Sequence, residues 1–279
     1  SMCIAKIAKI IPYMPSMESK GELLDILSQA TWGAQDAISL SSLMLQLKLL
    51  SAKDEAHSIH VEVALDNILL KLLETIPKIT RFDGQAIGNA FYGLQNLEHS
   101  PVVEDILSAL AKKIPTVHYL KGQAIGNALY GLKNLQDSPA VREVLNALAE
   151  KIPAILHFSG QNIGNALYGL QHFKNSEAVE RALTALATKI PKVTDDFDAQ
   201  NLGNAFYGLK NLHDSPALQA VLKALITKIL TATSLDSQAI GNALYGLRNI
   251  TDQTILERVL HSFKRVLENQ SYQMTAQKI

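Results

Sequence analysis

The chain has 279 residues, in which 26 Lys and Arg balance 26 Asp and Glu, and it is 47% hydrophobic but only 6% aromatic. The zero formal net charge excludes a strongly basic nucleic-acid tail and an acidic solvating segment, although it leaves a local patch open. A core of Leu, Ile, Ala and Val favours helices over sheets. The single cysteine, Cys3, excludes an internal disulfide framework and indicates a reducing, cytoplasmic location. No apolar run approaches the roughly 18 residues of a membrane span, so no membrane association is expected.

Residues 1–81 predict an N-terminal helical cap that contains one degenerate repeat. A capping helix is expected over 20–30, and a helix pair near 35–50 and 65–76. The link between the members of this pair contains His57 and His60, the two histidines that lie closest together in the chain. A solvated loop is favoured over a metal site there, and no metal is expected.

The next part of the chain is a repeat. The segment Gln-Ala-Ile-Gly-Asn-Ala-Phe-Tyr-Gly-Leu beginning at Gln85 returns from Gln123, Gln161, Gln200 and Gln238, at intervals of 38, 38, 39 and 38 residues. Each copy is followed by a polar link, usually Ser-Pro, which is a helix start signal. A second apolar-periodic segment then ends in most units at Ile-Pro, where proline cannot continue a helix.

Two helices in every 38 residues predict an all-α fold, an α-solenoid with helical caps. Five repeats are expected over residues 82–268, with 252–267 as the last second helix and 269–279 as a C-terminal tail. Because no linker rich in Pro, Gly or Ser divides the chain, it is expected to form one cooperative array.

The first helix of each unit has two faces. At about 100° per residue, Ile87, Phe91 and Leu94 share one apolar face, which should be buried against the second helix. The opposite face carries Gln, Asn and Tyr, flanked by two glycines. Glycine costs up to about 1 kcal/mol in a helix, so its recurrence indicates close approach of the neighbouring first helices. The polar stripe then lies either on an open concave surface or in the seam between units.

The candidate ligand-binding surface comprises three columns. Tyr can stack on a ligand and Gln or Asn can hydrogen-bond to it, whereas the alternative is a structural ladder that joins neighbouring units. At the edge of the stripe one position varies between Gln and a cation, for which a solvated flank is favoured over contact with an anionic ligand. The candidate residues are Tyr92, Tyr130, Tyr168, Tyr207, Tyr245, Gln123, Gln161, Gln200, Lys133, Lys210 and Arg248.

Four further lysines recur near the ends of the second helices. They suit the negative C-terminal end of a helix, and a basic edge is the alternative interpretation. They are Lys113, Lys151, Lys189 and Lys228.

The motif Gln-x-[Ile/Leu]-Gly-Asn-x-[Leu/Phe]-Tyr-Gly-Leu resembles the octotricopeptide repeat over residues 82–268. It is most similar to the Gly-Asn-Ala-Leu-Tyr-Gly-Leu variant of candidate effectors from intracellular pathogens. The resemblance implies a solenoid whose first helices line the inner surface and, for an effector, delivery into a host cell. Organellar members of this family bind RNA at roughly one nucleotide per repeat. Here Tyr replaces the family's Trp and Gly replaces its Ala.

No combination of residues predicts catalysis. Gly88 and Gly93 have the spacing of a phosphate loop, but they lie inside a helix and no Gly-Lys-Ser/Thr follows. We therefore expect a non-enzymatic binding scaffold without cofactors, which recognises a protein or peptide on its concave surface. The alternative is a single-stranded RNA binder. RNA affinity comes largely from neutralised phosphates, and residues 82–268 contain 17 Lys and Arg against 17 Asp and Glu, so no net field attracts RNA.

Overall fold

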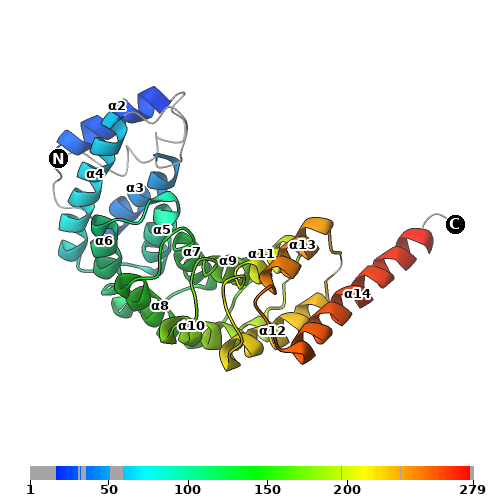
Figure 1. Cartoon of the computed structure of the whole chain (residues 1–279). Helices are drawn as coiled ribbons and strands as arrows, with labels where there is room; N and C mark the ends of the chain where they lie inside the picture. The colour runs from blue at the N-terminus through cyan, green and yellow to red at the C-terminus, as the bar shows by residue number, and fades with distance from the viewer. Residues whose placement is uncertain are drawn as a thin grey trace.

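Two rows of helices run side by side along the chain and curve into an arc (Figure 1). The structure is a computed structural model and describes residues 17–30, 32, 36–50, 59–195, 197–232 and 234–276. These residues form α-helices and short 3-10 turns, without a strand. The α-helices are α2 (Met17–Gln29), α3 (Ala37–Leu50), α4 (Ile59–Thr75), α5 (Gly84–Gly93), α6 (Pro101–Ala111), α7 (Gly122–Gly131), α8 (Pro139–Lys151), α9 (Gly160–Tyr168), α10 (Glu177–Ala187), α11 (Ala199–Tyr207), α12 (Pro216–Ile229), α13 (Ser237–Gly246) and α14 (Gln253–Ala276).

Each helix packs mainly on the equivalent helix of the neighbouring unit. The first helices α5, α7, α9, α11 and α13 form the inner row of the arc, and α3 continues this row toward the N-terminus. The second helices α6, α8, α10, α12 and α14 form the outer row, which α4 and α2 continue in the same way. The expected all-α solenoid is therefore confirmed, and α3 with α4 is the degenerate unit.

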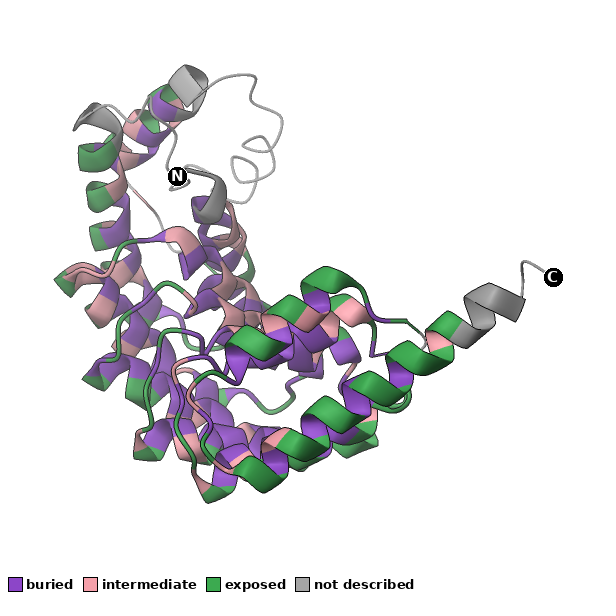
Figure 2. Cartoon of the chain, turned by 45° about the vertical axis from the view of Figure 1, so that its right-hand side comes forward, coloured by how far each residue is buried: buried purple, intermediate pink, exposed green. Residues whose placement is uncertain are grey.

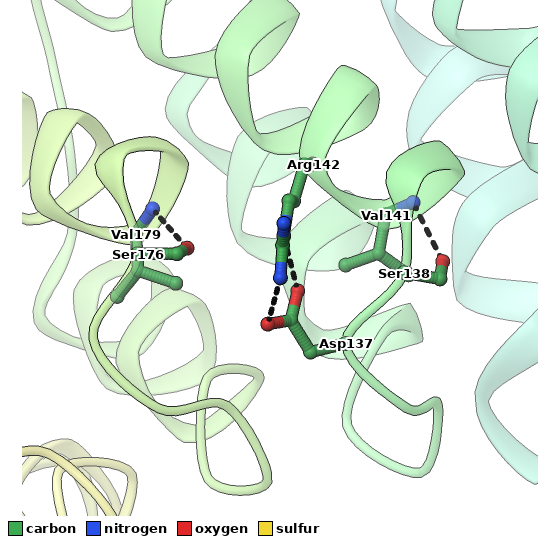
Figure 3. Close-up of polar contacts among 6 residues, drawn as sticks. All are labelled: Asp137, Ser138, Val141, Arg142, Ser176 and Val179. Atoms are coloured by element: carbon green, nitrogen blue, oxygen red, sulfur yellow. Dashed lines mark hydrogen bonds and ion pairs between the residues drawn. The ribbon is translucent and has the colours of Figure 1, made fainter.

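Serine side chains start the second helices, as the sequence predicts. Ser138 Oγ accepts a hydrogen bond from the Val141 amide at 3.2 Å, and Ser176 Oγ accepts one from the Val179 amide at 3.4 Å (Figure 3). Each cap satisfies one of the amides that a helix N-terminus leaves without a partner. Because Ser176 caps its helix without a following proline, the cap is the more constant part of this signal.

Ile-Pro pairs end the second helices. After α4, α6, α8 and α10 the pair lies in a 3-10 turn that follows the helix directly or within three residues, as at Ile114–Thr116. α12 and α14 lack this proline: α12 nevertheless ends at Ile229, whereas α14 runs on to Ala276. Residues 269–276, which were expected to form a tail, are thus a continuation of this helix.

The core lies between the two rows of helices. Figure 2 shows buried residues along the sides of the helices where the two rows meet. Ile87 and Phe91 on α5, and Leu94 in the turn after it, are fully buried, as the helical periodicity predicts. Their equivalents in the units that begin with α7, α9 and α11 are buried as well, so one continuous apolar core extends along the array. Each unit therefore depends on its neighbours for burial of its apolar faces.

The glycines are the points of closest approach within the inner row. A Cβ atom on Gly126 would lie 2.8 Å from the Asn162 carbonyl oxygen of the following unit. A Cβ on Gly131 would overlap the Phe91 carbonyl group of the preceding unit. The two glycines thus face opposite seams, and their backbones touch the neighbouring helices directly. This confirms close approach as the reason for their recurrence.

The same substitution at two equivalent glycines is expected to have opposite effects. Gly126→Ala should lower the free energy of unfolding by about 1–3 kcal/mol because it overpacks a backbone contact. Gly241 has the same place in α13, but no atom lies within 4 Å of its Cβ position. Gly241→Ala should therefore raise stability, by up to about 1 kcal/mol, through helix propensity alone. Urea denaturation of dilute protein measures both changes, and equal effects would contradict the assignment of the seams.

Candidate binding surface

The glutamine column lies on the solvent-exposed side of the inner row. Gln85, Gln123, Gln161, Gln200 and Gln238 are all exposed, whereas the asparagines one turn later are half-buried. The column lies opposite the buried apolar face and therefore faces the inside of the arc. The glutamines of the polar stripe thus lie on the concave surface, which was one of the two places that the sequence allowed for the stripe.

A hollow of about 510 Å³ opens between the N-terminal ends of α5 and α7. Gln85, Asn89 and Gln123 line it from the helices, and His118 and Tyr119 line it from the link between units. The hollow places amide side chains of two successive units beside an exposed aromatic ring, since the Tyr119 side chain is 69% exposed. It is therefore a mainly apolar recess that also carries amide groups from two units.

The tyrosine column is a continuous stack that crosses every seam. Ring centroids of successive residues from Tyr92 to Tyr245 are 5.5–5.6 Å apart, with interplanar angles of 19–25°. Both faces of Tyr130, Tyr168 and Tyr207 are thus directed at neighbouring rings. Offset stacking of this kind stabilises each pair by about 0.5–1.5 kcal/mol.

This spacing is too small for a ligand ring to enter the stack. Bases stack about 3.4 Å apart, so one base between two tyrosines would need about 7 Å. The rings are closer than that at every step. The structural ladder, which was left open beside the ligand-stacking interpretation, is the arrangement present.

The variable position at the edge of the stripe forms a second ladder. Lys133 Nζ donates to Gln95 Oε1 at 3.2 Å, and Lys210 Nζ donates to Gln171 Oε1 at 2.9 Å. Arg248 Nη2 donates to Asn211 Oδ1 at 2.7 Å. Each hydrogen bond joins a side chain to the preceding unit.

The same three cations also lie over tyrosine rings. The distance from the cation to the ring centroid is 4.4 Å for Lys133 on Tyr130, 4.0 Å for Lys210 on Tyr207, and 4.3 Å for Arg248 on Tyr245. Such cation–π contacts strengthen when water is excluded from them.

The expectation of a solvated flank at this position is wrong for most of the column. Gln95, Gln171 and Lys210 are 5–7% exposed, and Lys133 is half-buried. Only Arg248, in the last unit, is exposed among these five residues. The sequence carries a signal for the pairing, because Gln and Lys alternate along the column and each lysine finds a glutamine one unit earlier.

The lysines of the second helices clamp the preceding unit. Lys189 Nζ donates to the carbonyl oxygens of Pro153 and Ile155 at 2.8 and 2.7 Å. Lys113, Lys151 and Lys228 each donate to the two equivalent carbonyl oxygens of the unit that precedes them. These four ammonium groups are engaged by backbone carbonyls rather than arranged as a free basic edge. Each satisfies carbonyls at the end of the preceding second helix.

Burial changes the ionisation of two of these clamp lysines and of Lys133 in the other ladder. Desolvation lowers the pKa of Lys189 and of Lys228, and the neighbouring charge of Lys192 lowers that of Lys189 further. Desolvation also lowers the pKa of Lys133, partly offset by Tyr168 and Tyr92. The seams thus hold positive charge at some cost in solvation.

Two features of the surface were not found by sequence reasoning. Asn134, Asn211 and Asn249 bridge the seams by donating to a backbone carbonyl of the preceding unit at 2.7–2.8 Å. The other feature is a pair of exposed link residues before each of α5, α7, α9 and α11, which differs from unit to unit. These pairs are Thr80 and Arg81, His118 and Tyr119, Leu156 and His157, and Thr194 and Asp195. Their variation at a constant register was the available signal.

Within the described residues, His, Cys, Asp and Glu do not gather in groups of three that could hold a metal ion. Residue 57 lies outside these residues, and the side chain of His60 is not described. Among the same residues, no helix combines the length and apolarity that crossing a membrane requires.

The chain was compared with known proteins. No protein-family model matches it, and no curated protein matches it. Among solved structures, a designed armadillo repeat protein has a TM-score of 0.36 at 15% identity, covering 88% of this chain and 99% of the other. A computationally designed armadillo repeat protein for modular peptide recognition has a TM-score of 0.36 at 16% identity, covering 89% and 100%. An engineered protein has a TM-score of 0.28 at 15% identity, covering 94% and 98%. Similarity at this level carries no argument about function.

Removing the Lys210 ammonium group should destabilise the array. In Lys210→Met the buried Gln171 oxygen loses its donor, and the free energy of unfolding should fall by about 1–3 kcal/mol. Lys223 is exposed on the outer row, and Lys223→Met should change stability by less than about 0.5 kcal/mol. Chemical denaturation of both variants measures the difference, and equal small effects would mean that the lysine ladder is not structural.

The lowered pKa of Lys189 predicts a dependence of stability on pH. The folded protein releases this proton at a lower pH than the unfolded chain, whose value is near 10.5. At a pH between the folded-state and unfolded-state pKa of Lys189, unfolding therefore takes up a proton. The free energy of unfolding contributed by this group should rise with pH in that range. The neutral amine keeps two N–H groups, enough for both carbonyls.

The slope of unfolding free energy against pH should therefore be more positive in the wild type than in Lys189→Met. NMR titration of the Lys189 Cε signal should show a pKa below the ordinary lysine value of 10.5. A pKa at or above that value would contradict desolvation of the clamp.

Proposed function

We propose that the protein is a non-enzymatic scaffold that binds a protein or peptide partner along its concave surface. The observation that carries the proposal is the column of five exposed glutamines on successive inner helices. A primary amide both donates and accepts hydrogen bonds, as each peptide group of an extended chain does. A row of such amides at a constant repeat is suited to main-chain recognition that is independent of the partner's sequence.

The variable link pairs are the proposed source of specificity. They lie beside the N-terminal ends of the inner helices, where His118 and Tyr119 line the hollow next to Gln85 and Gln123. Leu156 is 95% exposed, which offers an apolar contact one unit further along. Arg81 lies near one end of this series and Asp195 near the other, so a partner with an acidic residue near Arg81 and a basic residue near Asp195 fits best.

The seam contacts favour a polypeptide over RNA. The Tyr faces are directed at other Tyr rings, and Lys133 and Lys210 are bonded within the array, as are the four clamp lysines. RNA binding needs accessible cations and open aromatic faces. The resemblance to octotricopeptide repeats, the cytoplasmic location and the delivery of an effector into a host cell are parts of the proposal that rest on the sequence alone.

A displayed random-peptide library tests the proposal. Peptides selected on the full chain should bind it. The triple variant in which Ala replaces Gln123, Gln161 and Gln200 should bind at least about tenfold more weakly, because each lost hydrogen bond contributes about 0.5–1.5 kcal/mol. Thr184 and Lys223 are exposed on the outer row, so their joint replacement with Ala is the control and should leave binding unchanged. Fluorescence anisotropy of a labelled selected peptide measures both.

Mixed-sequence single-stranded RNA is the competing probe. Under the proposal it should bind only weakly at physiological salt. Tight, sequence-selective RNA binding that is lost in Tyr168→Ala and Tyr207→Ala would overturn the proposal, as would a selected peptide whose binding depends on the outer row.

A further inference from the structure

The last inner helix, α13, has an open face that every earlier unit covers. Gly88, Gly126, Gly164 and Gly203 each meet backbone atoms of the following unit, with a Cβ-to-backbone separation of 2.8–3.0 Å. Gly241 is the equivalent glycine of α13, and nothing lies within 4 Å of its Cβ position. The close approach that this glycine permits is therefore unused in the single chain.

Apolar side chains of α13 and α14 are exposed at the same end of the array. The residues equivalent to Leu244 in the four earlier units, among them Phe91 and Phe206, are 0% exposed, whereas Leu244 is 48% exposed. Tyr245, at the end of the tyrosine column, is also 48% exposed. A groove of about 440 Å³ runs between α13 and α14, with Ile240, Leu244, Leu260 and Leu267 among its apolar lining residues. An exposed apolar patch of this kind marks an interaction site.

The outer row is closed at the same end. At one position of the second helix the four complete earlier units bury an apolar side chain, as Val144 does in α8 and Val221 in α12. In α14 this position is Arg258, which is exposed. A further second helix packed on α14 would bury the charge of Arg258. Burying a charge that has no described partner is costly in free energy. The end of the array therefore has room for one more inner helix but not for a complete two-helix repeat.

A second copy cannot supply that helix from its N-terminal end. The second glycine of each inner helix overlaps the preceding backbone if it is given a Cβ, as Gly93 does against the Met44 carbonyl. Gly131 meets Phe91 in the same way, so Met44 in α3 is the equivalent of Phe91 in α5. Gly93 lies two residues after Phe91, and Gln46, two residues after Met44, therefore takes the place of this glycine in α3. A helix stacked on α3 at the usual distance would collide with the Gln46 side chain. Head-to-tail growth of the array is thereby blocked.

We propose that two copies of the chain associate through their α13 faces about a two-fold axis. Gly241 and Leu244 are three residues apart and lie on one ridge of the helix. In an antiparallel pair, Leu244 of each copy packs over Gly241 of the other, so both contacts form at once. Such a self-complementary contact is what a two-fold interface requires.

The charges at the groove are also self-complementary. Lys264 and Glu268 are exposed lining residues and pair with each other at 3.8 Å within α14. Across a two-fold axis the same two residues can pair between copies without leaving an excess of either charge. The patch is small, so a weak dimer in the micromolar range is expected.

Sedimentation velocity of the full chain over a wide concentration range tests the proposal. The wild type should pass reversibly from monomer to dimer. Gly241→Gln, which places a long side chain on the face where the two helices must meet, should raise the dimer dissociation constant by about 100-fold or more, because the dimer contains the change twice. Leu244→Glu should do the same. Leu70→Glu, at a leucine of α4 that is 50% exposed and lies far from α13, is the control and should leave the dimer intact.

Circular dichroism of each variant checks that it is folded, which is expected because Gly241 and Leu244 are open to solvent. A wild type that stays monomeric at the highest concentration would overturn the proposal. A dimer that survives Gly241→Gln and Leu244→Glu would overturn it too, since its interface would lie elsewhere. Larger oligomers that grow with concentration would show head-to-tail stacking and also contradict it.

Discussion

Backbone contact between neighbouring inner helices is the constraint on which the rest of the structure depends. Glycine at two positions per unit lets helix backbones touch, where any Cβ would collide with the next or the preceding chain segment. The cost in helix propensity, up to about 1 kcal/mol per glycine, is offset by burial of Ile87, Phe91 and their equivalents. The same closeness brings each tyrosine within stacking distance of the next.

Polar groups that a looser array would expose are drawn into these seams. Lys210 is buried although it carries a charge, because a glutamine oxygen and a tyrosine ring both face it. The Lys189 ammonium group closes the end of the preceding outer helix in a comparable way. The buried positive charges therefore hold units together, whereas the exposed glutamine column carries neutral amides. This division between seam and surface is the physical basis for favouring a polypeptide ligand.

The two ends of the array are built differently. At the N-terminal end, Gln46 replaces a glycine and prevents another inner helix from approaching. At the C-terminal end, Arg258 closes the outer row while Gly241 keeps the inner row open. A repeat array needs altered terminal units because one face lacks a neighbour. Here the N-terminal end is closed to a further inner helix, whereas at the C-terminal end only the outer row is closed. Association is therefore confined to the open face of α13.

The sequence by itself determined the solenoid. Its 38-residue period, the Ser caps and the Ile-Pro stops predict both helices of each unit, because these signals act within a few residues of the backbone they control. It also indicated the buried face and the close approach at the glycines. Only the tertiary structure decided what the polar columns do. Whether Tyr168 or Lys210 meets solvent depends on the side chain that the neighbouring unit places opposite it. That side chain lies 37–40 residues away along the chain, and a local sequence pattern does not specify such a contact.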